Sequence, residues 1–104
     1  MRLAIATINR HAPSETFIRA HVARLPAPVL FLTGGEMPDT ASEGLDGPLE
    51  PITPSGRVTT PALAAFLKAR GVEVLLAEYG PVGVAVGPAC HASGIPLVVH
   101  FYGY

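Results

Sequence analysis

Short apolar runs alternate with amphipathic segments along this chain. The apolar runs predict buried strands at residues 3–8, 29–32, 72–77 and 95–101. Apolar residues at helical spacing predict helices that start at Ser14 and at Thr60 as N-caps and end near Leu25 and before Gly71.

A third helix is predicted between Pro81 and Gly94, and it has an irregular feature. Pro88 lies in its interior, where a proline removes a backbone hydrogen bond. We therefore expect either a kink near Gly87 or two short helical turns.

Residues 34–59 break the alternation. They are rich in Gly, Pro, Ser, Asp and Glu and have little periodicity. Unstructured loops of this length are uncommon in compact domains. We expect a short strand at residues 49–52 and otherwise a flexible, Gly/Pro-rich excursion.

The alternation predicts one α/β domain over residues 1–104, built on an open, mostly parallel, Rossmann-like sheet with helices on both faces. Such sheets bind ligands at the carboxyl ends of their strands. Three loops fall at that edge, with the sequences "NRHAPSE", "EYGP" and "YGY".

Composition excludes several classes of protein. The net charge of −1 and only seven Lys and Arg residues argue against binding to nucleic acid. One cysteine excludes an internal disulfide and fits a cytoplasmic location. Charged residues make up only 14% of the chain, so we expect a partner or another domain to cover part of the surface.

No membrane-spanning segment or signal peptide is predicted from the apolar runs, which are too short. No basic amphipathic helix supports contact with a membrane surface, and such contact is kept only as an alternative.

The first candidate site is the predicted helix start at Ser14, Glu15 and Thr16. A helix N-terminus with hydroxyl donors can hold a phosphate or carboxylate. The alternative is that Ser14 only caps the helix and Glu15 only complements its dipole.

The second candidate site is Glu78, Tyr79 and Gly80, directly after a predicted strand. A glutamate at this position could hydrogen-bond a hydroxylated ligand or act as a base. It could equally be a solvated acid at the start of the next helix.

Other motifs give little support for chemistry. The glycines of "GPVGVAVG" do not have the dinucleotide-binding spacing, and no phosphate-binding lysine loop occurs. No histidines are spaced as metal ligands, and no Ser-His-Asp arrangement is identified. His100, with His11 as a second candidate, falls at the ligand edge, while His21 and His91 fit helix surfaces and Cys90 fits the core.

Two stretches, "PSETFI" and "AEYGPVGVAVGPACHASGIPLVVHFYGY", resemble the N-terminal domain of family 4 glycosyltransferases. These are retaining enzymes with the two-Rossmann GT-B fold, and the resemblance is nearest to members that build bacterial surface polysaccharides. It covers residues 1–25 and 60–104. The end of the chain, "GIPLVVHFYGY", is similar to the family's "GIPLVVTFHGYD".

The resemblance implies that this domain holds the sugar acceptor, while a C-terminal domain holds a nucleotide-sugar co-substrate. It implies no further cofactor and no obligatory metal. It would place Ser14, Glu15 and Thr16 near the donor phosphate or the acceptor, and Tyr102 and Gly103 at the turn facing the transferred sugar. Tyr102 occupies a position where many members have histidine, so that contact does not carry over, although His100 lies close by.

The family continues beyond this point with an aspartate and a helix. We therefore expect residues 1–104 to be part of a longer cytoplasmic enzyme, with peripheral membrane contact left open, and to be inactive alone. A non-catalytic α/β binding module and another GT-B-like enzyme, such as a sugar-nucleotide epimerase, are the alternatives.

Overall fold

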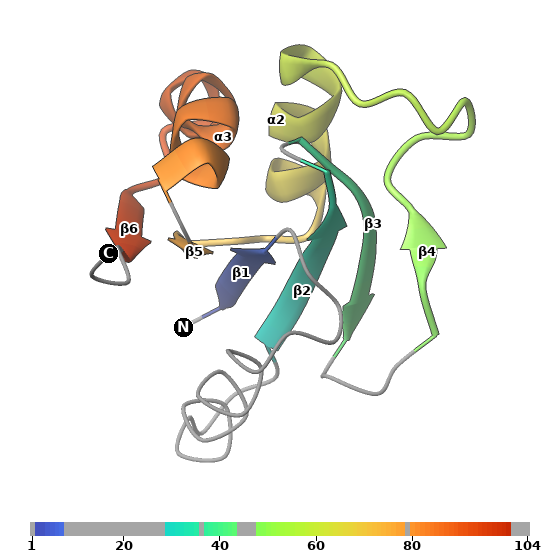
Figure 1. The fold of residues 1–104 in the computed structure, drawn as a ribbon, viewed down its shortest axis with the longest axis horizontal. Helices are drawn as coiled ribbons and strands as arrows, with labels where there is room; N and C mark the ends of the chain where they lie inside the picture. The colour runs from blue at the N-terminus through green and yellow to red at the C-terminus, as the bar shows by residue number, and fades with distance from the viewer. Residues whose placement is uncertain (1, 8–28, 36, 44–47, 79, 101–104) are drawn as a thin grey trace.

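The computed structural model describes residues 2–7, 29–35, 37–43, 48–78 and 80–100. These residues form a six-stranded sheet and two helices (Figure 1). The elements, in chain order, are β1 (Leu3–Thr7), β2 (Val29–Gly34), β3 (Pro38–Glu43), β4 (Glu50–Pro51), α2 (Thr60–Ala69), β5 (Val74–Glu78), α3 (Gly80–Ser93) and β6 (Leu97–His100).

The sheet is mixed but mostly parallel, with strand order β4-β3-β2-β1-β5-β6. The four strands predicted from apolar runs, β1, β2, β5 and β6, pair in parallel. The strands β3 and β4 extend the sheet beyond β2 in antiparallel pairing. The predicted α/β class and mostly parallel sheet are therefore confirmed, and so is the short strand near residues 49–52.

The flexible excursion predicted for residues 34–59 is wrong where β3 lies. β3 has few apolar residues, but it pairs with the buried strand β2 along its length. Its Ala41 enters the core, and its Thr40 hydroxyl lies 3.0 Å from the hydroxyl of Thr33 on β2. Pairing and burial thus override the weak strand propensity of this segment.

Gly34 makes the turn from β2 into β3 possible. It has a φ of +140°, and a Cβ atom added there would lie 2.7 Å from the backbone nitrogen of Asp39. Only glycine tolerates both the backbone conformation and the close approach.

Both described helices end in the same way. In α2, the N–H groups of Gly71 and Val72 donate to the carbonyls of Lys68 and Leu67, at 3.0 and 3.1 Å. Gly94 and Ile95 make the equivalent bonds after α3. These are Schellman motifs. Because the N–H groups of Val72 and Ile95 bond to the last turn of each helix, β5 and β6 begin two residues later than predicted.

The start of α2 differs from the prediction by one residue. Thr59, not Thr60, is the N-cap, and its Oγ1 accepts a hydrogen bond from the backbone N–H of Ala62 at 3.3 Å. Thr59 has the extended backbone that an N-cap requires, while Thr60 is already helical.

The prediction that α3 splits into two short turns is also wrong, because Gly80–Ser93 is one helix that includes Pro88. Pro88 is exposed, and so is Val84, whose carbonyl loses its helical partner. Water can therefore replace the missing hydrogen bond. A bend near Gly87 stays a prediction.

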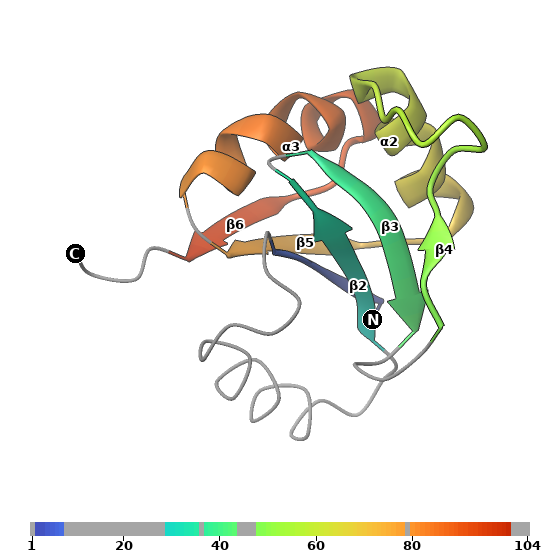
Figure 2. The ribbon, with the colours of Figure 1, turned by 45° about the vertical axis from the view of Figure 1, so that its right-hand side comes forward.

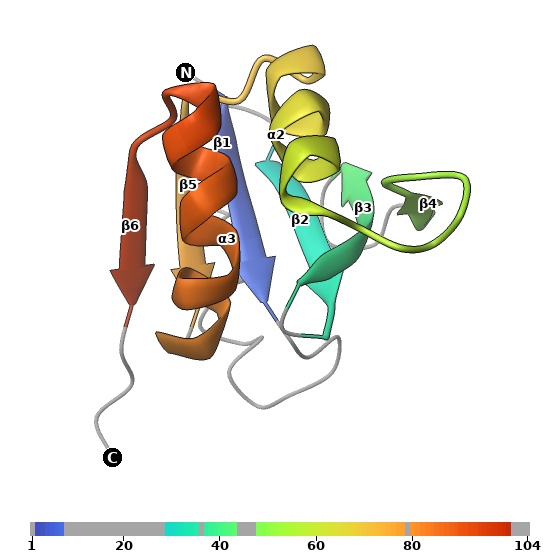
Figure 3. The same ribbon diagram turned by 90° about the horizontal axis from the view of Figure 1, so that it is seen from above.

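The two helices lie side by side over one face of the sheet (Figures 2 and 3). The core beneath them contains Leu63, Leu67, Val82 and Val86 from the helices, together with alternate residues of the strands. On the opposite face Ile5, Val29 and Phe31 form a second buried cluster, with Leu3 and Leu76 against it. The helix predicted at residues 14–25, and with it the prediction of helices on both faces, falls outside the described residues.

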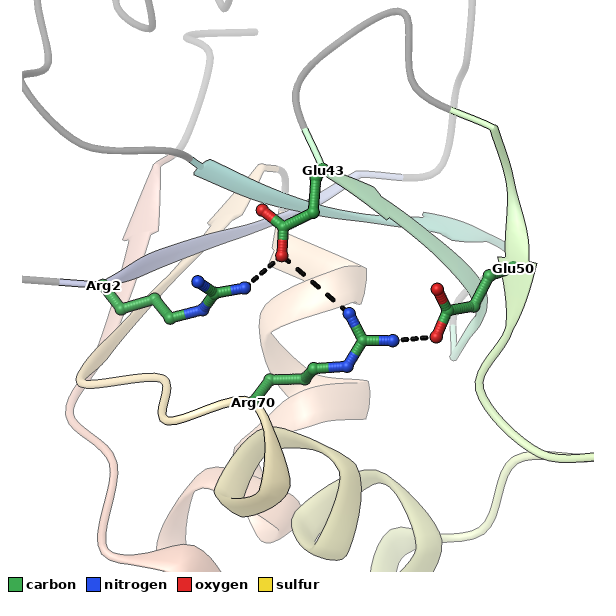
Figure 4. A network of polar contacts seen from close by, with 4 residues as sticks. All are labelled: Arg2, Glu43, Glu50 and Arg70. Atoms are coloured by element: carbon green, nitrogen blue, oxygen red, sulfur yellow. Dashed lines mark hydrogen bonds and ion pairs between the residues drawn. The ribbon is translucent and has the colours of Figure 1, made fainter.

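At the edge where the parallel strands begin, four charged side chains form a network (Figure 4). Arg2 is paired with Glu43 at the end of β3, and Arg70 at the end of α2 is paired with Glu50 on β4. Arg70 also lies 3.9 Å from Glu43 and stacks on the ring of Phe66, 4.8 Å from its centroid. This network, the amino-edge network, ties the antiparallel part of the sheet to β1 and α2.

Candidate functional site

At the opposite edge, each of the four parallel strands carries a polar residue at or near its carboxyl end. These residues are Thr33 on β2, Thr7 on β1, Glu78 on β5 and His100 on β6. Thr7 pairs with Thr33, and Glu78 pairs with His100. Thr7 and Glu78 directly follow the paired residues Ala6 and Ala77, which places the four at one level across the sheet. We call them the polar row.

The polar row lies on the face opposite α2 and α3. Side chains alternate between the two faces of a strand, and Ala77 and Val99 pack into the core under the helices. Their neighbours Glu78 and His100 therefore belong to the other face. There the apolar residues Phe31, Ile5, Leu76 and Val98 occupy the level below the polar row, since they are joined by the same strand pairings.

The glutamate and the histidine of the row are in direct contact. His100 Nδ1 lies 3.2 Å from Glu78 Oε2, within hydrogen-bonding distance. The side chain of Glu78 is only 1% exposed, whereas that of His100 is 39% exposed. The pair therefore has a buried acidic end and an accessible imidazole end.

The other end of the row is held by hydroxyl groups. Thr33 and Thr7 are both buried. The Thr40 hydroxyl on β3 also donates to the carbonyl of Thr33 at 3.2 Å, in addition to its contact with the Thr33 hydroxyl. The threonines on β2 and β3 are thus engaged with each other, and the histidine is the member of the row with the most exposed side chain.

A close contact between α3 and β6 supports the position of His100. A Cβ added at Gly83 would lie 2.7 Å from Cγ2 of Val99. The helix can therefore lie against β6 only because residue 83 has no side chain. Val99 is the neighbour of His100, so this contact fixes the strand that carries the imidazole.

Of the predicted site residues, Glu78, Gly80 and His100 lie within the described part of the chain. Gly80 is the first residue of α3, one residue earlier than predicted, and it follows the last residue of β5 by two positions. Glu78 is not the solvated acid that was one of its two interpretations, because its side chain is buried. The remaining predicted residues fall outside the described residues: Ser14, Glu15, Thr16, Tyr79, Tyr102 and Gly103.

Thr7 and Thr33 were not among the predicted site residues. A signal for both is present, because each parallel strand follows its apolar run with a polar residue: "LAIAT", "VLFLT", "VLLAE" and "LVVH". The predicted places of two other side chains are confirmed, since His91 is exposed on α3 and Cys90 is buried. Burial raises the pKa of the Cys90 thiol, so it remains protonated and unreactive.

Within the described ranges, no three His, Cys, Asp or Glu side chains are grouped so that they could hold a metal ion. None of the helices in these ranges is long and apolar enough to cross a membrane.

Comparison with known proteins assigns the chain to no family and no function. No protein-family model matches the chain, and neither do any curated proteins or solved structures. The features of the chain that point to a function are therefore the polar row and the residues that carry the sequence resemblance.

The polar row offers a defined set of interactions. A carboxylate only accepts hydrogen bonds, whereas a hydroxyl both donates and accepts them. A neutral imidazole donates from one ring nitrogen and accepts at the other. With the carboxylate buried, a ligand at this edge would meet the imidazole. These are groups suited to a neutral, hydroxylated ligand rather than to a polyanion.

Proposed function

We propose that this chain is the acceptor-side, Rossmann-like domain of a retaining glycosyltransferase and that His100 contacts a hydroxyl group of the acceptor sugar. The observation that carries the proposal is the Glu78–His100 pair at the carboxyl edge of the sheet. Both residues belong to the stretch that resembles the family 4 enzymes. Parallel α/β sheets bind their ligands at this edge.

The rest of the reaction belongs to a second domain in this proposal. That domain would hold the nucleotide-sugar donor and stabilise the departing nucleotide diphosphate, which is the main electrostatic task in sugar transfer. Residues 1–104 alone would bind an acceptor and transfer nothing. Turnover of a nucleotide sugar by this chain alone would contradict that division of labour.

Acceptor binding is testable with the 104-residue chain and simple probes. A ¹⁵N-labelled sample would be titrated with methyl glycosides of glucose, galactose and mannose. We expect at least one of them to shift the backbone resonances of Glu78, Gly80 and His100 more than those of the amino edge. The variant His100→Ala should abolish these shifts.

Glu73, just before the strand that ends in Glu78, provides a control. Glu73 precedes β5 at the amino edge, where its carboxylate accepts a hydrogen bond from the backbone N–H of Arg2 at 3.2 Å. Glu73→Gln should leave glycoside binding unchanged. The proposal fails if no glycoside perturbs the carboxyl edge, or if His100→Ala and Glu73→Gln weaken binding equally.

A further inference from the structure

We infer that Glu78 is a positioning residue, which holds His100 as the Nδ1–H tautomer and so presents Nε2 as a hydrogen-bond acceptor for a ligand hydroxyl. The role of the ligand rests on the proposed function. The tautomer does not, because it follows from the contact between the two side chains.

Burial separates the roles of the two residues. At 1% exposure, the Glu78 side chain is not presented to solvent at the sheet edge, so it has no direct access to a ligand. The imidazole of His100 is 39% exposed and turns one nitrogen, Nδ1, toward the carboxylate. A ligand that approaches this edge therefore meets the histidine, and the glutamate acts through it.

The chemistry of the contact determines which nitrogen carries the proton. A carboxylate has acceptors only, so in the pair that we infer Nδ1–H donates to Glu78 Oε2 across the 3.2 Å contact. In the neutral imidazole the other nitrogen, Nε2, then has a lone pair. A carboxylate or carbonyl that binds one ring nitrogen sets the tautomer of histidine in this way at many functional sites.

The backbone holds both partners in place. Glu78 and His100 are register partners on adjacent parallel strands, and each is the last residue of its strand. The strand β6 is in turn fixed by the contact of Val99 with Gly83 of α3. The orientation of the imidazole is therefore built into the sheet before any ligand arrives.

The tautomer can be measured directly with ¹⁵N-histidine-labelled protein. At the alkaline end of an NMR titration, the shifts of the two ring nitrogens distinguish the protonated from the unprotonated one. We expect His100 to carry its proton on Nδ1. His91, which is exposed on α3, serves as the internal reference and should show the Nε2–H form that unconstrained imidazole prefers.

Two variants complete the test. Glu78→Gln keeps the shape of the side chain but removes the charge, and it should shift His100 toward the Nε2–H form without affecting His91. It should also weaken binding of a methyl glycoside about three- to tenfold, the size expected for one net hydrogen bond. Glu73→Gln should change neither.

The outcomes separate this inference from the proposed function. An Nε2–H tautomer for His100 in the unmodified protein overturns the inference, as does a tautomer that Glu78→Gln leaves unchanged. An Nδ1–H tautomer in a protein that binds no glycoside supports the positioning role of Glu78 and overturns the proposed function. The first measurement needs no variant, so the inference is testable even if Glu78→Gln does not fold.

Discussion

The two edges of the sheet both carry paired ionisable side chains, but in opposite environments. At the amino edge, the side chains of Arg2, Arg70, Glu43 and Glu50 are 27–53% exposed. At the carboxyl edge, Glu78 is 1% exposed and pairs with a histidine. Exposed ion pairs form at little cost in desolvation, whereas a buried carboxylate loses its hydration. The difference suggests that the amino edge holds the fold together and that the carboxyl edge serves a site.

One of the two largest effects that we predict concerns the turn that carries β3 away from the carboxyl edge. Gly34→Ala should destabilise the protein by about 1–3 kcal/mol, the cost of a strained backbone, because Gly34 has a φ of +140° and approaches the backbone of Asp39. Urea denaturation would measure the loss. Gly35→Ala is the control, since a Cβ there meets nothing within 4 Å. Equal losses in the two variants would show that β3 does not depend on this turn.

The next prediction tests the cost of the buried pair. His100→Ala should destabilise the protein by about 1–3 kcal/mol, because a buried polar group loses a partner. The double variant Glu78→Leu with His100→Ala should recover part of this loss, since an apolar side chain carries no desolvation penalty. Urea denaturation of the single and double variants would measure both effects.

If the double variant were less stable than His100→Ala alone, the pair would be a stabilising element like those at the amino edge. The comparison of the two edges would then fail.

The amino-edge network should contribute less. A double-mutant cycle of Arg2→Ala and Glu43→Ala should give a coupling energy of about 0.2–1 kcal/mol, as for other exposed pairs. The coupling should fall at about 0.5 M salt, where exposed charges are screened. A coupling well above about 1 kcal/mol, or one unaffected by salt, would contradict the description of the amino-edge network as a set of exposed ion pairs.

The parallel part of the fold could be predicted from the sequence because each of its strands contains an apolar run. The runs "LAIA" of β1 and "VLLA" of β5 are apolar without interruption, so they specify strands wherever they pair. The strand β3, "PDTASE", could not be predicted, because its structure comes from its pairing with β2 and from Gly34 rather than from its own residues. Helix ends at Gly71 and Gly94 were predictable, because each glycine has a positive φ that other residues disfavour.

The candidate site was predictable only in part, for a related reason. Position after a buried strand identified Glu78 and His100 as edge residues. Their contact depends on the register of β5 against β6, which no local pattern in the sequence specifies. Thr7 and Thr33 were missed because a threonine at the end of a strand is common, and only the register shows that they share one level with the acid and the histidine.

The smallest predicted effect concerns Cys90, a core residue of α3 that belongs to neither edge. Burial raises the pKa of its thiol, so at alkaline pH the unfolded chain ionises this group before the folded protein does. The stability that the thiol contributes is therefore complete below the ordinary pKa of cysteine and is lost as pH rises above it.

Cys90→Ala isolates this effect, because every other titrating group is the same in the two proteins. Stability measured in urea between about pH 7 and pH 10 should fall more steeply with pH for the unmodified protein than for the variant, since its unfolded state releases the thiol proton at a lower pH than its folded state does. Parallel curves would mean that the thiol ionises equally in both states, and so that water reaches the core between the two edges.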